Sequence, residues 1–218
     1  MLSELPFSSY LSYDPRPSTK EEVQAKAFVV NAIKFDRLLK TNTGYSTAAS
    51  LCAESLRDHQ HETPFADLFA TQPMLIPIPG SSKTQPGTLW VPSRFVIAMA
   101  KCGLGTSNAC LKRVQAVQKS AFAKPGQRPT AQEHYDSMKV DGGSLTERGR
   151  IILVDDVVTR GATMLGAASR VAEAFPNAEI VGFAMVRVVG WNSKFKALAD
   201  PVGGQISLSS NGNTHRDP

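Results

Sequence analysis

Two adjacent carboxylates beside a glycine-containing turn are the residues of this chain whose chemistry is easiest to name. Asp155 and Asp156 follow the apolar run 151–154, and the turn 159–163, which reads Thr-Arg-Gly-Ala-Thr, leads into a small-residue helix. Carboxylates in such a place can bind sugar hydroxyls or the hydration shell of a metal ion. A turn that opens a helix presents backbone N–H groups and a partial positive charge to a phosphate. The segment therefore predicts a ligand that carries both phosphate and ribose.

A purely structural interpretation exists for the same residues. Asp155 and Asp156 would then begin a polar turn after a strand and cap the following helix, with no ligand involved. The residues alone leave this alternative open.

The elements around this segment alternate between strands and helices. Apolar runs at 74–79, 150–154 and 179–189 predict buried strands, and the patterns at 91–101 and 162–175 predict helices between them. Such alternation predicts an α/β fold with an open, mainly parallel sheet and helices on both faces. Ligands of such sheets bind at the carboxyl ends of the strands, where the acidic pair falls.

The ends of the chain differ in pattern from this centre. Residues 1–18 are rich in serine and proline and predict an irregular lead-in. A Ser-x-x-Glu capping box beginning at Ser18 opens a predicted helix over about 19–40, and a second helix is predicted over about 46–57. Gly, Ser and Asn dominate 203–218, which predicts a disordered tail.

Two basic, polar stretches accompany the predicted sheet. The first is a small loop, Gly80-Ser81-Ser82-Lys83, directly after the strand at 74–79. The second covers about 113–134, contains a Pro-Gly turn and predicts a long flexible lid. His59 and His61 lie in a polar segment with no nearby cysteine, so a solvated loop explains them better than a metal site.

Composition bounds the classes of function. Lys and Arg total 24 against 19 for Asp and Glu, and the net charge of +5 favours anionic partners, nucleic acid among them. The three cysteines form no CxxC pair, and no apolar run reaches the roughly 18 residues of a membrane span. The chain opens without a secretory pattern, so we expect a cytoplasmic protein with no membrane partner. No P-loop and no dinucleotide-binding glycine motif occurs.

The segment 151–163 resembles the phosphoribosyl-diphosphate (PRPP) binding signature of the type I phosphoribosyltransferases. The apolar strand with its polar loop at 75–84 and the basic stretch at 111–128 are similar to the ComF-like branch of that family. The N-terminal cysteine cluster common in ComF-type proteins is missing, and Gly80 to Thr84 replace an arginine-rich loop. The resemblance covers about 25–190.

The resemblance implies the architecture of the whole chain. It predicts a type I phosphoribosyltransferase-like domain over 19–202, with an N-terminal helical addition and a small hood near 188–202 that shapes an acceptor pocket. Homodimers are common in the family, so a homodimer is expected. Arg187 would either approach the acceptor or be exposed, and His134-Tyr135 would either stack on a base or pack on the sheet.

Matching positions imply a role for each part of the motif. Asp155 and Asp156 would bind the ribose 2- and 3-hydroxyls, and the loop of Gly80, Ser81, Ser82 and Lys83 would hold the diphosphate. The 5-phosphate would lie in the turn formed by Thr159, Arg160, Gly161, Ala162 and Thr163. Mg²⁺ would be held mainly by PRPP and reach the acidic pair through water. Closure of the lid would bring Lys119, Lys124 or Arg128 to the diphosphate.

The implied reaction displaces diphosphate from ribose C1 by a nitrogen nucleophile, with Asp155, Asp156, Lys119 and Arg128 as the catalytic residues. The 6-oxopurine enzymes carry an Asp at the position of Thr159, so hypoxanthine and guanine are not expected acceptors. The acceptor is otherwise unidentified. Two other functions stay open: a non-catalytic PRPP sensor or nucleic-acid-binding regulator, and a defence or toxin effector built on the same fold.

Overall fold

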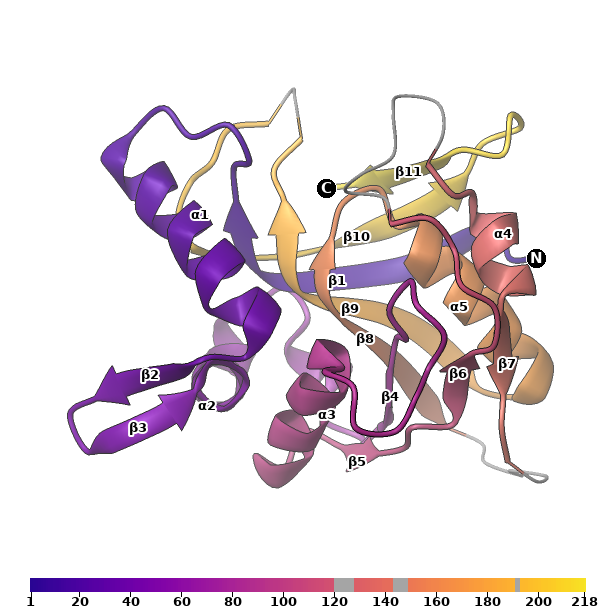
Figure 1. Cartoon of the computed structure of the whole chain (residues 1–218), viewed down its shortest axis with the longest axis horizontal. Coiled ribbons are helices and arrows are strands. Elements are labelled where there is room, and N and C mark those ends of the chain that lie inside the picture. Colours follow the sequence, from indigo (N-terminus) through magenta and orange to yellow (C-terminus); the bar gives the residue numbers. More distant parts are fainter. Residues whose placement is uncertain (120–127, 143–148, 191–192) are drawn as a thin grey trace.

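A seven-stranded sheet forms the centre of the computed structural model, which describes residues 1–119, 128–142, 149–190 and 193–218 (Figure 1). The strand order is β11-β10-β1-β9-β8-β4-β5. Strands β5, β4, β8, β9 and β1 run parallel, β10 runs antiparallel to β1, and β11 runs antiparallel to β10. The strand bounds are β1 (Glu4–Tyr13), β4 (Met74–Pro77), β5 (Thr106–Ser107), β8 (Arg150–Val158), β9 (Glu179–Val188), β10 (Ala199–Leu208) and β11 (Thr214–Asp217).

Helices cover both faces of this sheet and divide the hydrophobic core in two (Figure 1). The first core contains α1 (Lys20–Asn31), α2 (Ala48–His59) and α3 (Val91–Lys101), and the second contains α4 (Ala131–Asp136) and α5 (Ala162–Ala174). Ile152 and Val154 of β8 pack into the first core, whereas Ile151 and Leu153 pack into the second. A strand buried on both faces needs such a continuous apolar run. The predicted α/β fold, a mainly parallel sheet with helices on both faces, is confirmed.

The central elements lie close to their predicted positions. Helix α3 matches its predicted range, and β4, α2, α5 and β9 agree within two residues at each end. β8 continues to Val158, however, beyond the predicted end at residue 154. The acidic pair therefore lies inside the strand rather than after it.

The expectation of an irregular lead-in at 1–18 is wrong, because β1 occupies most of it and lies between β9 and β10. The serines that indicated turns are buried in the sheet: Ser9 and Ser12 have no exposed surface. The Ser12 hydroxyl donates to the carbonyl of Ala197 at 2.9 Å, whereas the Ser9 hydroxyl has no partner among the described residues. Small hydroxyl side chains fit a crowded strand interior as well as they fit a turn.

The expected disordered tail at 203–218 is also ordered, because β10 and β11 form an antiparallel hairpin there. Gly204 shows why the sequence is glycine-rich: a Cβ at this position would lie 2.0 Å from the carbonyl oxygen of Asp217. The glycine permits close approach of two backbones and does not mark fraying. The hood predicted near 188–202 therefore ends inside a strand of the main sheet.

The helix predicted over 19–40 ends early. Its capping box is formed by Thr19 and Glu22, one residue after the predicted pair, and α1 stops at Asn31. A short 3₁₀ helix, η1 (Ile33–Phe35), ends at Asp36, whose φ of 45° is incompatible with continued helix. The chain then forms the hairpin β2 (Leu38–Thr41) and β3 (Gly44–Thr47).

The stretch expected to be a lid contains regular structure. β6 (Leu111–Arg113) pairs antiparallel with β7 (Met138–Val140), and α4 lies between them in the chain. Residues 120–127, in the middle of the predicted lid, lie outside the described residues.

Two further 3₁₀ helices follow α2: η2 (Gln60–Glu62) and η3 (Ala66–Leu68). Within the described ranges no helix is long and apolar enough to cross a lipid bilayer.

Candidate functional site

Two polar loops leave neighbouring strands at the carboxyl edge of the sheet. β4 and β8 pair in parallel, with Pro77 opposite Val154. The loop 78–90 follows β4 and the turn 159–161 follows β8. The predicted diphosphate loop and the predicted phosphate turn therefore begin on adjacent strands, as the sequence pattern required.

The turn before α5 is built around Gly161. Its φ is 88°, and a Cβ there would lie 2.6 Å from Cδ1 and 2.8 Å from Cγ2 of Ile206 in β10. Only glycine avoids both the strained backbone and this clash. No described side chain caps α5, and its first turn holds no acidic residue. The backbone N–H groups at this end of α5 keep their capacity to bind an anion.

Arg216 of β11 holds the same turn from its other side. Its Nε donates to the carbonyl of Thr159 at 2.8 Å and its Nη2 to the carbonyl of Val188 at 2.7 Å. Burial, assisted by nearby Arg187, lowers the pKa of Arg216 to about 10, so the guanidinium stays charged at neutral pH. The predicted disordered tail thus supplies two supports of the turn, Ile206 and Arg216, which sequence reasoning missed.

We expect Arg216→Met to loosen the turn, because the carbonyls of Thr159 and Val188, as well as that of Pro218, would lose their charged donor. The free energy of unfolding should fall by about 2 kcal/mol, and amide hydrogen exchange should accelerate at 159–163. Denaturant unfolding and exchange monitored by NMR would measure both effects. Arg94→Met, which removes an exposed arginine on α3, is the matched control. Unchanged exchange at 159–163 in the Arg216 variant would contradict the prediction.

The acidic pair lies between a buried arginine and the end of β1. Asp155 and Asp156 are both partly buried, and Asp155 Oδ1 accepts the Asp156 N–H at 2.9 Å. Burial raises the pKa of Asp155, the neighbouring Asp156 carboxylate raises it further, and Arg113 opposes both effects. Burial raises the pKa of Tyr13, and the nearby Asp156 carboxylate raises it further. Asp155 thus lies on the side of Arg113 and Asp156 on the side of Tyr13, as neighbouring side chains of a strand do.

Arg113 is the buried cation that holds the loop after β4. Its side chain is 1% exposed and donates from Nε to the carbonyl of Gly80 at 2.6 Å and from Nη2 to that of Pro79 at 3.3 Å. Nη1 donates to Ser137 Oγ at 2.5 Å. Burial lowers the pKa of Arg113 to about 10, and Asp155 opposes that shift. Placing Arg113 at the start of a mobile lid was wrong: strand β6 fixes it in the core.

The rest of the predicted diphosphate loop is open to solvent. Gly80, Ser82 and Lys83 are exposed and Ser81 is partly buried, with its carbonyl accepting the Val117 N–H at 2.9 Å. A hollow of about 520 Å³ adjoins this loop. It is lined by Lys83, Trp90, Arg94, Lys112 and Arg113 among others. Gly80, Ser82 and Lys83 are therefore accessible to an anion from solvent.

The three residues predicted to act from the lid, and the histidine predicted to stack on a base or pack on the sheet, differ in their surroundings. Lys119 and Arg128 are described and exposed. Lys124 lies outside the described residues. His134 is buried in α4, where its Nε2 lies 3.1 Å from the Thr163 hydroxyl. The structure thus brings His134 to the phosphate turn, and the predicted approach of Lys119 and Arg128 to the diphosphate stays a prediction.

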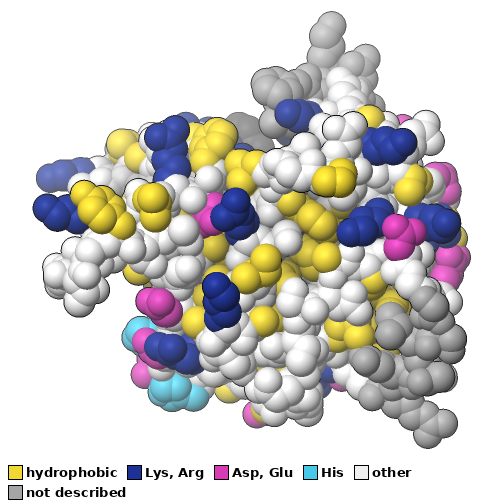
Figure 2. Space-filling view, turned by 60° about the horizontal axis from the view of Figure 1, so that its bottom comes forward, with side chains coloured by type: hydrophobic (Ala, Val, Ile, Leu, Met, Phe, Trp, Pro, Cys, Tyr) yellow, Lys and Arg dark blue, Asp and Glu magenta, His cyan; other side chains and the backbone are white. Residues whose placement is uncertain are grey.

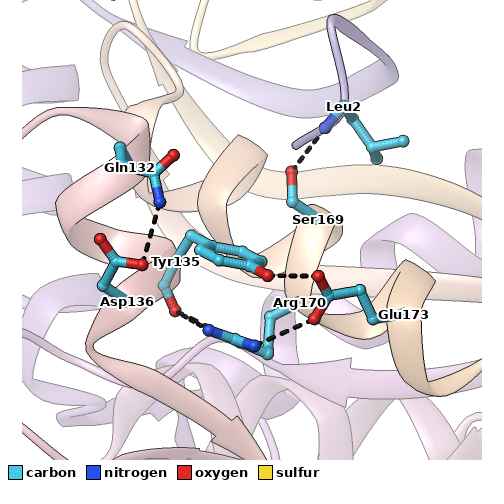
Figure 3. Close-up of polar contacts among 7 residues, drawn as sticks. All are labelled: Leu2, Gln132, Tyr135, Asp136, Ser169, Arg170 and Glu173. Carbon is cyan, nitrogen blue, oxygen red and sulfur yellow. Dashed lines mark hydrogen bonds and ion pairs between the residues drawn. The ribbon is translucent and has the colours of Figure 1, made fainter.

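Tyr135 packs on α5 (Figure 3). The Arg170 guanidinium lies 3.7 Å from its ring centroid, and the Tyr135 hydroxyl donates to Glu173. Arg170 donates to the Tyr135 carbonyl, and on the far side of α5 Ser169 accepts the Leu2 N–H at 3.0 Å. Helix α4 is therefore fixed to α5 and is not a free part of a lid.

Arg187 is neither exposed nor free to reach an acceptor. It is 8% exposed and forms an ion pair with Asp200 of β10. Its other nitrogen donates to the Asp200 carbonyl. Both contacts tie the end of β9 to β10, so its role in the structure is to join these strands.

The histidines of the 59–62 segment make local contacts. His59 Nδ1 lies 2.8 Å from the Ser55 carbonyl, and His61 pairs with Glu62 at 3.5 Å. Among the described residues, no group of three His, Cys, Asp or Glu side chains could hold a metal ion.

Basic side chains do not merge into one track on the face shown in Figure 2. Lys and Arg side chains are dispersed there among apolar and uncharged ones, with acidic groups between them. A nucleic-acid backbone is bound by a continuous basic surface. This face, in the part that the structure describes, offers none.

Comparison with known proteins gives likenesses of fold only. No family model and no curated protein matches this chain. Orotate phosphoribosyltransferase from Aeropyrum pernix shares 14% identity over 73% of this chain and 81% of its own, with a TM-score of 0.35. Adenine phosphoribosyltransferase from Leishmania donovani shares 11% identity over 88% and 92%, with a TM-score of 0.38.

A third similar structure is an alanine mutant made to analyse an invariant aspartic acid in HPRTs. It shares 14% identity over 75% of this chain and 79% of its own, with a TM-score of 0.34. At such identities and TM-scores, any functional conclusion must come from the residues of this chain itself. The finer resemblance to the ComF-like branch stays a prediction from the sequence.

Proposed function

We propose that this chain is a phosphoribosyltransferase that binds PRPP and transfers its phosphoribosyl group to a nitrogen nucleophile. One observation carries the proposal: the uncapped N-terminus of α5 opens behind the Gly161 turn, directly after a strand that carries Asp155 and Asp156. A phosphate site and two hydroxyl-binding carboxyls thus lie within one continuous segment. The purely structural interpretation, in which the carboxylates cap the helix, loses support because no side chain caps α5 among the described residues.

Each polar part has a role in this proposal. The turn Thr159–Thr163 holds the 5-phosphate, Asp155 and Asp156 bind the ribose hydroxyls, and Gly80–Lys83 hold the diphosphate. Arg113 positions that loop by its bonds to the carbonyls of Pro79 and Gly80. Because the loop begins on β4 and the turn on neighbouring β8, one ligand can reach both.

The chemistry would come mainly from charge stabilisation. Departure of diphosphate from ribose C1 leaves a positive charge on the sugar and negative charge on the leaving group. Mg²⁺ bound with the substrate would neutralise the diphosphate, and the oxygen donors of Asp155 and Asp156 suit a magnesium-bound water. Lys119 and Arg128 are exposed, so both are free to approach the diphosphate in the loaded protein.

The experiment that tests the proposal is calorimetric titration with PRPP and Mg²⁺. Asp155→Asn and Asp156→Asn should each weaken PRPP binding about tenfold or more, because each replaces a carboxyl oxygen that accepts a hydrogen bond from a ribose hydroxyl. Asp67→Asn removes an exposed carboxylate far along the chain and is the control for the change in net charge. Equal affinity in all four proteins would contradict the proposed ribose contacts.

Diphosphate release separates the proposed enzyme from a non-catalytic sensor. A wild-type protein that binds PRPP should release diphosphate when supplied with the correct nitrogen nucleophile from a panel. Binding without release across the panel would favour the sensor, and absence of binding would leave nucleic acid as the ligand to test.

A further inference from the structure

His134 is a buried polar side chain that contacts the phosphate turn and has no role in the chemistry above. It is 3% exposed, and its Nε2 lies 3.1 Å from Thr163 Oγ1 in the first turn of α5. A Cβ at Gly166 would lie 2.8 Å from His134 Cβ and 2.5 Å from the Ala131 carbonyl, so α4 sits directly on α5. The imidazole therefore has little freedom to move away from Thr163.

The other ring nitrogen fixes the tautomer. Nδ1 of His134 is buried and has no hydrogen-bond partner among the described residues. A proton on Nδ1 would be a buried donor without an acceptor, and such orphaned N–H groups are rarer than orphaned acceptors. Burial, with a smaller contribution from the Arg113 cation, lowers the pKa of His134 to about 4, so the ring is neutral. Its single proton is accordingly on Nε2, facing Thr163.

The direction of this hydrogen bond decides what Thr163 can do. If Nε2–H donates to Thr163 Oγ1, the hydroxyl keeps its own proton for another acceptor. Thr163 belongs to the first turn of α5, where the backbone N–H groups already favour an anion. With the opposite tautomer the hydroxyl would donate to His134 and present lone pairs to the anion, which is repulsive.

We infer that His134 is a positioning residue that sets the Thr163 hydroxyl as a hydrogen-bond donor toward an anionic oxygen bound at the N-terminus of α5. The inference rests on the proposed function in identifying that oxygen as part of the 5-phosphate of PRPP. His134 itself does not touch the ligand.

Two probes separate this role from a structural one. Ribose 5-phosphate tests the phosphate turn and inorganic diphosphate tests the loop after β4, each by calorimetry. His134→Phe should weaken ribose 5-phosphate binding about tenfold and leave diphosphate binding unchanged. His134→Gln, whose amide Nε2 can donate in place of the imidazole, should stay within about threefold of wild type.

A control on the same helix tests general loosening of α4. Tyr135→Phe removes the bond to Glu173 without touching Thr163 and should leave both affinities unchanged. Equal loss of both probes in His134→Phe, or loss in Tyr135→Phe as well, would overturn the inference in favour of a packing role.

The tautomer gives a readout that needs no ligand. The ¹⁵N shifts of the His134 ring should show the proton on Nε2, and a proton on Nδ1 would overturn the inference. Ribose 5-phosphate binding that is normal in wild type and in His134→Phe would overturn it while leaving the proposed function intact. A wild-type protein that binds neither PRPP nor ribose 5-phosphate would overturn both.

Discussion

Replacing Arg113 with methionine is expected to lower the free energy of unfolding by about 3 kcal/mol and to abolish measurable diphosphate binding. The buried guanidinium is the partner of the Pro79 and Gly80 carbonyls and of Ser137 Oγ. Methionine fills most of the volume and supplies no donor, so three acceptors would be left unpaired. The loop after β4 would then lose the contacts that shape it.

Lys112→Met is the matched control for the Arg113 variant. Lys112 is the neighbouring cation in β6, and its ammonium lies 5.6 Å from the Trp90 ring centroid. The control should change stability by less than about 1 kcal/mol. Denaturant unfolding and diphosphate titration would measure both variants. An Arg113→Met protein as stable as the control would contradict the prediction.

Gly161→Ala is expected to have the second large effect. The methyl group would meet three carbons of Ile206, all within 2.9 Å, and the φ of 88° would strain any side chain. Ile206 has no exposed surface, so it has no open space into which to move. Strain and overpacking together should cost about 3 kcal/mol. PRPP binding should fall about a hundredfold, because displaced N–H groups no longer converge on the phosphate.

Two comparisons divide the cost at Gly161 into its parts. Gly212→Ala carries a similar φ of 79° with nothing within 4 Å of the added methyl, so it reports backbone strain alone. Ile206→Ala combined with Gly161→Ala removes the clash, so the double variant should lose less stability than the two single variants lose in sum. If the stability losses of the two single variants simply add in the double variant, the Ile206 contact is not the cause of the loss in Gly161→Ala.

The central strands and helices were predictable because a strand that is buried on both faces has an apolar residue at nearly every position. The run 150–154 is apolar at every position after Arg150, and small residues pack α5 against the sheet. β1 lacks this pattern, because its buried serines resemble those of a turn. β10 was missed for a similar reason: its Gly204 serves close backbone contact with β11, and only the folded structure shows that contact.

Some residues of the candidate site were predictable from the sequence, and others were not. The acidic pair and the Gly161 turn were found because their residue types and spacing lie within one segment. Arg113, His134 and Arg216 approach that segment from elsewhere in the chain, and each looks ordinary in its own surroundings. The buried Arg113 gave no signal of its own in the sequence, because it follows Lys112 at the start of a basic stretch.

The position of β1 has a consequence for the order of folding. β1 is the first strand in the chain, yet its two neighbours in the sheet are β9 and β10. Glu4 pairs with Ser207, so the registering contacts span almost the whole sequence. During synthesis both edges of β1 must wait unpaired until residues 179–208 have emerged. Contacts of such long sequence separation slow folding, and they make this strand the segment most exposed to misassociation while the chain is incomplete.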